Sequence, residues 1–373
     1  MRLAPLPLAL LVTLTACNMN PSGRDERTPA AAPASTGGDP LAAHDPAEGA
    51  ALDPSLADDR PRPVMQIQVV LDRLGFTPGV VDGEQGLSTR NALAGFQEAR
   101  GLNPTGTLDD STRQALGRWS NIPATRVVTV PADFAAGPFA PLPERPDQQA
   151  KLKALGYETL DEKLAERFHT TPETLYALNP ALAPQPAASP ASAARFAAGQ
   201  KVRVPNVGAD RIDPAAVKDA AWRGTLASLG VGTAQPAVSR IVVSKSKGTL
   251  KAYDDAGKLV ALFTATMGSR HDPLPLGTWK IKGTAYNPPF HYNPDLFWDV
   301  PDSQGKELLP PGPNGPVGVA WIDLDKPHYG IHGTPEPQTI GRAESHGCVR
   351  LTNWDVARLA LMVKPGVRVV FEA

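Results

Sequence analysis

Proline-rich stretches divide this chain and limit how much of it can fold as one compact domain. The 373 residues include 40 prolines, many of which gather with alanine between residues 17 and 62 and between residues 120 and 150. Proline lacks a backbone N–H and interrupts helices and central strands, so both stretches favour linkers over folded elements. Because a chain of this length predicts about two or three domains, we place domain boundaries at these stretches.

The composition argues against two broad classes of protein. Hydrophobic residues make up 42% of the chain, which is enough to build cores and is not typical of a wholly disordered protein. The formal net charge is −1, so the sequence offers no electrostatic basis for binding nucleic acid.

The first sixteen residues have the pattern of an export signal. Arg2 supplies a basic start, and residues 3–12 are almost wholly apolar. This stretch is too short to span a bilayer as a permanent helix. Pro5 and Pro7 are unusual within such an apolar stretch, and they keep open the alternative of an ordinary secretory signal followed by a chance cysteine.

Cys17 ends a Leu-Thr-Ala-Cys tetrapeptide that matches a bacterial lipoprotein cleavage box, in which the cysteine becomes the lipid-modified first residue. We therefore predict a lipoprotein signal peptide at residues 1–16 and a disordered tether at residues 17–62. Such an anchor predicts attachment to a membrane on the periplasmic side of the cell envelope. Asn18 follows the cysteine, where an Asp would favour retention in the inner membrane, so we expect the outer membrane.

Residues 63–119 have the pattern of a small three-helix domain. Ile67, Val70, Leu71 and Leu74 follow helical spacing, and Gly75 stands where a C-terminal cap belongs. We expect Ser88 to cap a second helix that Gly101 ends, and Asp110 or Ser111 to cap a third.

Six short sequence words in this segment resemble those of the three-helix peptidoglycan-binding domain, and the resemblance implies that the segment binds the bacterial wall. They occur in the same order as in that family: Leu74-Gly75-Phe76, Val81-Asp82-Gly83, Thr89-Arg90, Phe96-Gln97, Gly101-Leu102 and Thr105-Gly106.

Residues 151–207 follow the Pro-rich linker at 120–150 and predict a small α+β module. Leu160, Leu164 and Phe168 lie on one helical face, Thr171 can cap a second helix, and residues 200–205 resemble a closing strand. This pattern is similar to a LysM glycan-binding module with an Ala/Pro insertion, although the opening strand expected near Tyr157 is blurred. A purely structural spacer is the alternative.

Residues 208–238 form a connector with a short helix around residues 222–229, and residues 239–373 predict a mostly β domain. Short apolar runs at 241–243, 250–253, 259–263, 279–282, 317–322 and 367–371 predict strands separated by Gly and Pro clusters. One good helix, for which we expect Asn353 as the cap, precedes the last strand.

Cys17 and Cys348 are the two cysteines of the chain. If Cys17 is acylated, Cys348 is a free thiol in an oxidising compartment, where a free thiol tends to be lost unless it has a function. Cys348 is therefore the first candidate for a nucleophile.

The residues around Cys348 suit nucleophilic catalysis. A thiol with a reference pKa of about 8.5 needs a base near pH 7. His332 can face the Cys348 thiol once the intervening loop folds back, and we expect it to be the base. His346 lies in the same tight turn as Cys348, and we expect it to have a supporting role. Gly347 allows a sharp turn that aims its own N–H and that of Cys348 at a developing oxyanion. Arg350 can bind a substrate carboxylate.

This cluster allows two other interpretations. A zinc site formed by His332, His346 and Cys348 has suitable ligand types but lacks a fourth ligand at a typical spacing. An inert buried cysteine beside core histidines fits poorly with the polar, glycine-rich run at residues 345–348.

The run from Ser345 to Leu351, with an upstream His332-Gly333, resembles the L,D-transpeptidase catalytic family over residues 239–372. Matching stretches also occur at residues 266–269, 275–278, 287–290 and 310–318. The resemblance implies a β-sandwich-like catalytic domain that acts on peptidoglycan stem peptides and needs no metal or organic cofactor.

By that resemblance, Cys348 attacks the carbonyl of the third stem residue and releases the terminal D-Ala, with His332 as the base. The Gly333 carbonyl orients the imidazole, and Ser345, His346 and Arg350 line the donor site. Some relatives carry Asn in place of Arg350. We also expect the aromatic-rich residues 287–298 to be local core or a lid over the cleft.

The acyl acceptor is left open by the sequence. It can be a diaminopimelate amine of a second stem, which gives a 3-3 cross-link, or a Lys of an envelope protein. Water as the acceptor would make the protein a peptidoglycan amide hydrolase. A non-catalytic tether that holds membrane to glycan is the third class, and an intact His332 and Cys348 argue against it.

Overall fold

The computed structural model describes residue 58 and residues 60–182, 195–208, 211–296, 305–343 and 347–373. The predicted signal and lipid cysteine Cys17, the site residues Ser345 and His346, and the last residues of the predicted lid lie outside these ranges. Within them, no helix has the length and apolar character needed to cross a bilayer.

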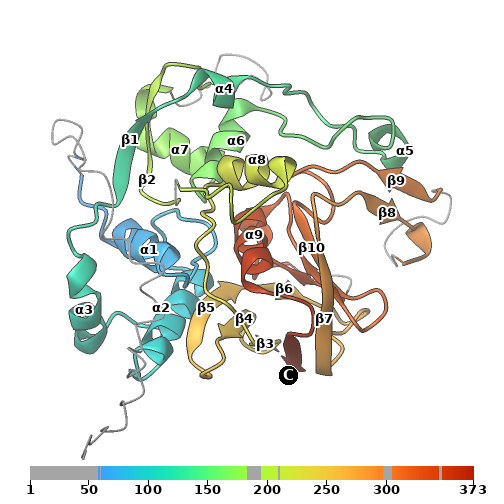
Figure 1. Ribbon diagram of the computed structural model, residues 1–373. Coiled ribbons are helices and arrows are strands. Elements are labelled where there is room, and N and C mark those ends of the chain that lie inside the picture. Colours follow the sequence, from blue (N-terminus) through green and yellow to red (C-terminus); the bar gives the residue numbers. More distant parts are fainter. Residues whose placement is uncertain (1–57, 59, 183–194, 209–210, 297–304, 344–346) are drawn as a thin grey trace, which may run out of the picture. The chain divides into compact units, whose positions relative to one another are not determined.

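The peptidoglycan-binding segment folds as three helices, as predicted. They are α1 (Pro63–Arg73), α2 (Leu87–Ala99) and α3 (Asp110–Leu116), the last followed by the short turn η3 (Gly117–Trp119) (Figure 1). Gly75 follows α1 with φ of 84°, the left-handed conformation expected after a helix C-terminus. Phe76, Phe96 and Trp119 form an edge-to-face series with centroids 6.1 Å apart at each step, at the centre of this core.

Two predicted helix caps of this segment are displaced by one or two residues. Gly86 precedes α2, so Ser88 is the second helical residue and not the cap. Asp109, instead of Asp110 or Ser111, caps α3, because its carboxylate accepts the backbone N–H of Thr112 at 2.8 Å.

The second module is larger than predicted. Its helices are α6 (Leu160–Arg167) and α7 (Pro172–Leu178), with Thr171 capping α7 as expected, and its closing strand is β2 (Lys201–Pro205). The strand that pairs with β2 is β1 (Thr125–Thr129), an antiparallel partner. The segment predicted as a 120–150 linker therefore supplies the opening strand, which is not near Tyr157. The short helices α4 (Ala132–Ala135) and α5 (Pro146–Gln149) follow β1. Identity with a LysM module stays a prediction.

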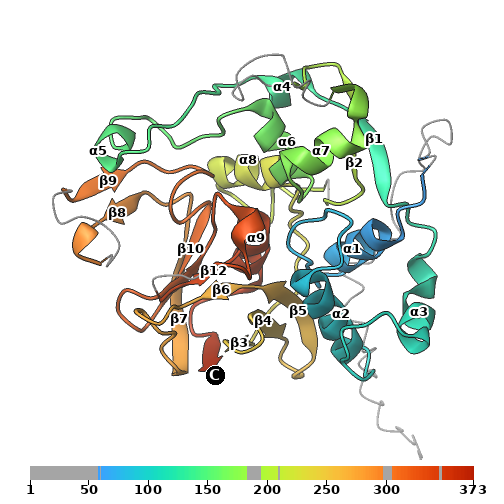
Figure 2. The same cartoon turned by 180° about the vertical axis from the view of Figure 1, so that it is seen from behind.

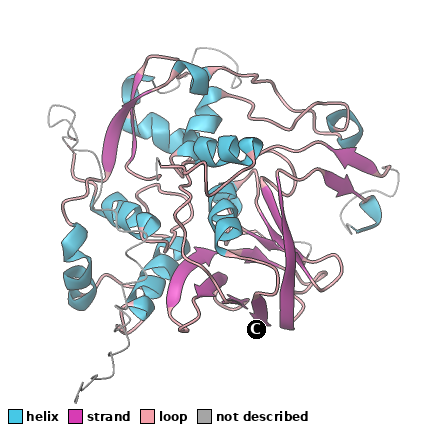
Figure 3. Cartoon of the chain, in the orientation of Figure 1, coloured by secondary structure: helices cyan, strands magenta, loops and turns pink. Residues whose placement is uncertain are grey.

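The C-terminal domain is built on a nine-stranded sheet, which confirms a mostly β domain (Figure 3). The order across the sheet is β5-β4-β3-β13-β7-β10-β11-β12-β6. The strands are β3 (Arg240–Ser244), β4 (Thr249–Tyr253), β5 (Leu259–Thr264), β6 (Thr266–Met267), β7 (Gly277–Tyr286), β10 (Ala320–Leu324), β11 (Gly330–His332), β12 (Val349–Arg350) and β13 (Arg368–Glu372). A separate two-stranded sheet joins β8 (Phe290–Tyr292) to β9 (Glu307–Leu309). The strand predicted at 317–322 begins instead at Ala320.

Two helices share an apolar core with the large sheet. They are α8 (Ala220–Leu229) and α9 (Asn353–Met362), whose buried side chains include Trp222 and Trp354. Thr352 caps α9 by accepting the N–H of Asp355 at 3.2 Å, so the predicted cap Asn353 is the first helical residue. This shift leaves the Asn353 side chain free for other partners.

The peptidoglycan-binding helices pack against the edge strand β5 of the catalytic sheet. Both views of the ribbon place α2 beside β5 (Figures 1 and 2). Thr77 N donates to Leu262 O at 2.9 Å, so the chain after α1 extends the sheet by one bridge. Gly95 permits this approach, because a Cβ there would lie 2.8 Å from the Leu262 side chain.

A fully buried ionic cluster joins all three parts of the chain. Asp72 of α1 accepts hydrogen bonds from Arg358 Nη2 of α9 at 2.8 Å and lies 3.1 Å from His169 Nδ1 of the second module. Burial alone would raise the pKa of Asp72, but the Arg358 and His169 partners outweigh it and hold that pKa below its usual range. His169 also stacks on Trp354, with centroids 5.1 Å apart.

We expect Asp72→Ala to lower the free energy of unfolding by about 3–5 kcal/mol, because it removes the carboxylate to which the buried Arg358 donates its hydrogen bonds. A carboxylate whose pKa is depressed by folding stabilises the protein above its unfolded pKa of about 4 and loses that effect as pH falls further. The stability gap between wild type and Asp72→Ala, measured by urea unfolding, should therefore be full at pH 7 and shrink below about pH 4. The exposed Asp255→Ala is the control, and an equal loss in both variants would contradict the prediction.

Candidate active site

The register of two short strands brings the predicted site residues to one face of the sheet. β11 and β12 run parallel, with Ile331 opposite Val349 and His332 opposite Arg350. Alternate residues of a strand share a face, so Cys348, two positions before Arg350, is directed to the same face as His332. The apolar Ile331 and Val349 are fully buried in the core on the other face.

The imidazole of His332 is buried and fixed by its neighbour. Nδ1 lies 2.7 Å from the carbonyl oxygen of Gly333, and because a carbonyl can only accept, Nδ1 carries the proton. Nε2 is then the atom with a free lone pair. Burial, together with the positive charge of Arg350, lowers the pKa of His332 to about 4, so the ring is neutral and able to accept a proton at pH 7.

Trp321 forms one wall of the site. It is the register partner of His332 on β10, and its ring stacks on the imidazole with centroids 5.5 Å apart and planes 20° from parallel. Gly330 is required beneath this ring, because a Cβ there would lie 2.5 Å from the indole. Sequence reasoning missed Trp321, although the alternation of side chains along β10 puts it on the face opposite to that of the buried Ile322.

The thiol of Cys348, just before β12, is half-buried. Burial raises its pKa, and the carboxylate of Asp272 adds to that effect, whereas a hydrogen bond from the Gly330 backbone and the charge of Arg350 act in the opposite direction. The sulfur also lies 3.7 Å from His328 O. At rest, the thiol and the imidazole are therefore both neutral.

Tyr329 and Asp272 flank the thiol, and sequence reasoning assigned neither of them a role. Gly347 has φ of 93°, and a Cβ there would lie 2.9 Å from the Tyr329 ring, so glycine is required before the cysteine. Burial, with the nearby charges of Cys348 and Asp272, raises the pKa of the Tyr329 phenol. One carboxylate oxygen of Asp272 is buried with no hydrogen-bond partner within the described residues.

The second module supports the backbone that holds His332. Asn353 Nδ2 donates to Glu166 Oε1 of α6 at 2.8 Å, and its Oδ1 accepts Val319 N at 3.2 Å. Gly333 packs directly on this amide, since a Cβ there would lie 2.3 Å from Asn353 Oδ1. Tyr157 OH donates to the other carboxylate oxygen of Glu166 at 2.8 Å. Burial raises the pKa of Glu166 to about 8.

A second connection reaches the same glycine from another direction. Gly333 N donates to Val317 O at 3.1 Å, and the loop before Val317 is bound to the second module. In that loop Asn314 N donates to Leu155 O at 3.0 Å, and Asn314 Nδ2 donates to Glu162 Oε1 at 2.7 Å. The orientation of the imidazole thus depends on contacts from outside the catalytic domain.

The structure places Cys348, His332, Gly333, Gly347 and Arg350 on or next to the adjoining strands β11 and β12, whereas Ser345 and His346 lie outside the described residues. Their catalytic roles stay predictions. The oxyanion role of the Gly347 and Cys348 N–H groups stays a prediction. Of the predicted lid, the described part holds the strand β8 and the short turn η5 (Pro294–Leu296). In the part of the chain that is described, no three His, Cys, Asp or Glu side chains gather as metal ligands would.

Two family models match the chain. Residues 239–371 match the L,D-transpeptidase catalytic domain of the YkuD type. The C-terminal domain belongs to the L,D-transpeptidase family. Residues 60–116 match a peptidoglycan-binding domain, so this enzyme carries a wall-binding domain at the position of helices α1 to α3.

Named relatives and a solved structure with similar stretches are as follows. Over 212 residues the chain is 29% identical to a protein of Bacillus licheniformis named as the L,D-transpeptidase YkuD, covering 57% of this chain and 92% of that protein. A 57-residue stretch is 54% identical to the protein of that name from Bacillus subtilis, covering 15% of this chain and 35% of that protein. The catalytic domain of the E. faecium L,D-transpeptidase, solved in a form acylated by ertapenem, is 20% identical over 36% of this chain and 97% of that chain, with a TM-score of 0.29.

We expect Glu166→Ala to disturb the His332 ring without contacting it, because Asn353 Nδ2 loses one of its two acceptors and the amide that packs on Gly333 is held less firmly. Imidazole ¹⁵N shifts should show the Nδ1–H tautomer alone in the wild type and a mixture of tautomers in Glu166→Ala. The isosteric Glu166→Gln, which can still accept from Asn353, should restore the wild-type spectrum. Glu173→Ala, at an exposed position of the same module, is the control. A single Nδ1–H tautomer in Glu166→Ala would disprove the connection.

Proposed function

We propose that this L,D-transpeptidase uses Cys348 as the nucleophile in an acyl-enzyme mechanism on peptidoglycan stem peptides. The observation that carries the proposal is the neutral, Nδ1-protonated His332, on the same face of the sheet as the Cys348 thiol. An imidazole in this state can act as a general base by accepting a proton at Nε2.

Acylation begins with transfer of the thiol proton to His332 Nε2 as the sulfur attacks the carbonyl carbon of the third stem residue. The C–N bond to the terminal D-Ala then breaks, and the imidazolium returns its proton to the departing amine. Because burial keeps both groups neutral at rest, the proton moves together with the attack and not before it.

Transfer of the acyl group repeats these steps in reverse. An acceptor amine loses a proton to Nε2 and attacks the thioester carbonyl, the C–S bond breaks, and the sulfur takes the proton back. We propose an amine as the acceptor, which gives a 3-3 cross-link or attaches an envelope protein. Arg350, opposite His332 in the register, is suited to bind a carboxylate of the donor stem, and Ser345 and His346 complete the donor site in this proposal.

The full chain should form a covalent adduct with ertapenem, seen by intact mass as addition of the whole compound. The Cys348→Ala variant should form none, and His332→Ala should react about 10²–10⁴-fold more slowly, the usual contribution of a general base. Incubation with disaccharide-tetrapeptide then identifies the acceptor, since dimers indicate an amine and tripeptides alone indicate water. A folded wild type with a titratable thiol and no adduct would refute the proposal.

The acylation rate should change little between pH 5 and pH 7. His332 must be neutral to accept a proton, so activity is lost as pH falls through its pKa of about 4. A histidine with the ordinary pKa of about 6.5 would instead slow the reaction by about 25-fold over the same interval. Second-order rate constants with ertapenem at the two pH values measure this, and a fall of that size would show that burial does not depress the His332 pKa.

We further propose that Cys17 carries a lipid that anchors the enzyme on the periplasmic side of the envelope, in the outer membrane, and that residues 151–207 bind glycan. The support is the cleavage box at residues 14–17 and a wall-binding domain in the same chain. Cys17→Ala should move the protein from the membrane fraction to the soluble fraction, and continued sedimentation with membranes would count against lipidation. Glycan binding is tested with wall sacculi stripped of stem peptides.

A further inference from the structure

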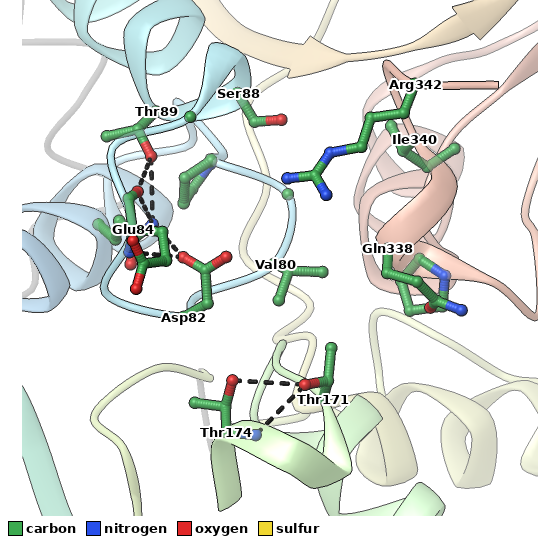
Figure 4. Close-up of a pocket in the computed structure, with 15 residues that line it drawn as sticks. Val80, Asp82, Glu84, Ser88, Thr89, Thr171, Thr174, Gln338, Ile340 and Arg342 are labelled. Atoms are coloured by element: carbon green, nitrogen blue, oxygen red, sulfur yellow. Dashed lines mark hydrogen bonds between the residues drawn. The ribbon is translucent and has the colours of Figure 1, made fainter. Parts of the chain in front are cut away.

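A pocket of about 210 Å³ lies away from the thiol, where three parts of the chain meet (Figure 4). Its walls come from the turn and helix start of the peptidoglycan-binding domain, from the start of α7, and from residues 337–342 of the catalytic domain. The lining residues are Gln68, Pro78, Gly79, Val80, Asp82, Glu84, Gly86, Ser88, Thr89, Thr171, Thr174, Pro337, Gln338, Ile340 and Arg342.

Several polar groups of this pocket have no partner among the residues that the structure describes. The guanidinium of Arg342 points toward the pocket, opposite Asp82 and Val80 (Figure 4). Across the described residues, the side chains of Arg342, Glu84 and Ser88 make no hydrogen bond or ion pair. The hydrogen bonds of the Asp82 carboxylate, from Gln68 at 2.9 Å and Glu84 N at 2.8 Å, both reach Oδ1 and leave Oδ2 available.

The charges are separated across the pocket and do not neutralise each other. Arg342 forms no ion pair with Asp82 or Glu84, so more than 4 Å separates the opposite charges. A ligand that fits between them must present an anion toward Arg342 and a cation toward the two carboxylates. This arrangement disfavours apolar ligands, polyanions and neutral sugars.

We propose that this pocket binds the stem peptide of peptidoglycan through a residue that carries both an ammonium and a carboxylate. The choice of wall material as the ligand rests on the proposed function. The choice of peptide over glycan rests on the charges of the pocket itself. Glycan strands of N-acetylated sugars have no cation for Asp82 and Glu84. A volume of about 210 Å³ is also below the usual range for a whole drug-sized ligand, so it admits one or two residues of a stem.

The pocket is linked to the site through its catalytic wall. Gly341 N donates to Thr266 Oγ1 at 2.8 Å, and Thr266 is the register partner of Arg350. Arg342 precedes Cys348 by six positions, so a chain of that length keeps the two within about 20 Å. A stem held in the pocket therefore belongs to wall material beside the nucleophile, and the wall-binding domain contributes to that placement directly.

The test uses the full chain with Cys348→Ala, so that the ligand is not consumed, and follows methyl NMR signals during titration with free tetrapeptide. Val80 and Ile340 report on the pocket, Ile331 reports on the core beneath the active site, and the exposed Leu308 is the distant control. Tetrapeptide should shift the Val80 and Ile340 signals. The N-acetylglucosamine–N-acetylmuramic acid disaccharide without peptide should not shift them, and shifts with that disaccharide alone would overturn the choice of peptide.

Variants of Arg342 test whether the positive charge of its side chain is responsible for binding the tetrapeptide. In the Cys348→Ala background, Arg342→Glu should weaken binding at Val80 by at least about tenfold, Arg342→Lys should lose less, and the exposed Arg90→Glu should bind as before. With Cys348 and Arg342 both intact, the exposed Arg90→Glu should react with ertapenem at the unchanged rate. Pocket shifts that survive Arg342→Glu, or no shift at all, would overturn the proposal. Failure of ertapenem acylation alone would refute the chemistry proposed for Cys348 and leave the pocket result standing.

Discussion

The buried carboxylate of Asp72 is the interaction on which the arrangement of this protein depends. A charge with no exposure is tolerated only when it is paired, and its partners, Arg358 and His169, come from two other parts of the chain. Thr77 OH adds a bond to Asp355 of α9 at 3.0 Å. The wall-binding helices and the second module therefore meet α9 in one fixed geometry, because any other geometry leaves a charge unpaired in the core.

The position of α9 matters for the chemistry because Asn353 is its first residue. The capping role passes to Thr352, which leaves the Asn353 amide to join Glu166 to the backbone around Gly333. Gly333 in turn accepts the hydrogen bond that sets the His332 tautomer. Glu166, which lies far outside the part of the chain that matches the catalytic family, is thus connected to His332 through two hydrogen bonds and one close packing contact. The catalytic domain of this enzyme is supported by the modules that precede it.

Sequence patterns predicted the long elements well and the short ones poorly. The helices α1, α6 and α7 and the strands β3, β4 and β5 have enough residues for an apolar period to be visible. The site strands β11 and β12 have three and two residues and are rich in glycine and polar side chains, so no period can show them. β1 was missed because it lies among prolines and pairs with β2 some 70 residues later in the chain.

By itself, the sequence determined the chemical identity of the site: a cysteine beyond a sharp glycine turn, an upstream histidine, and an arginine two residues after the cysteine. Those residue types and their order carry the family resemblance, because the reaction needs them whatever surrounds them. Only the tertiary structure decided the protonation state of His332, the stacking of Trp321, the support from Glu166 and the pocket at Arg342. Each depends on burial and on contacts between residues far apart in sequence, and local sequence patterns hold no information about either.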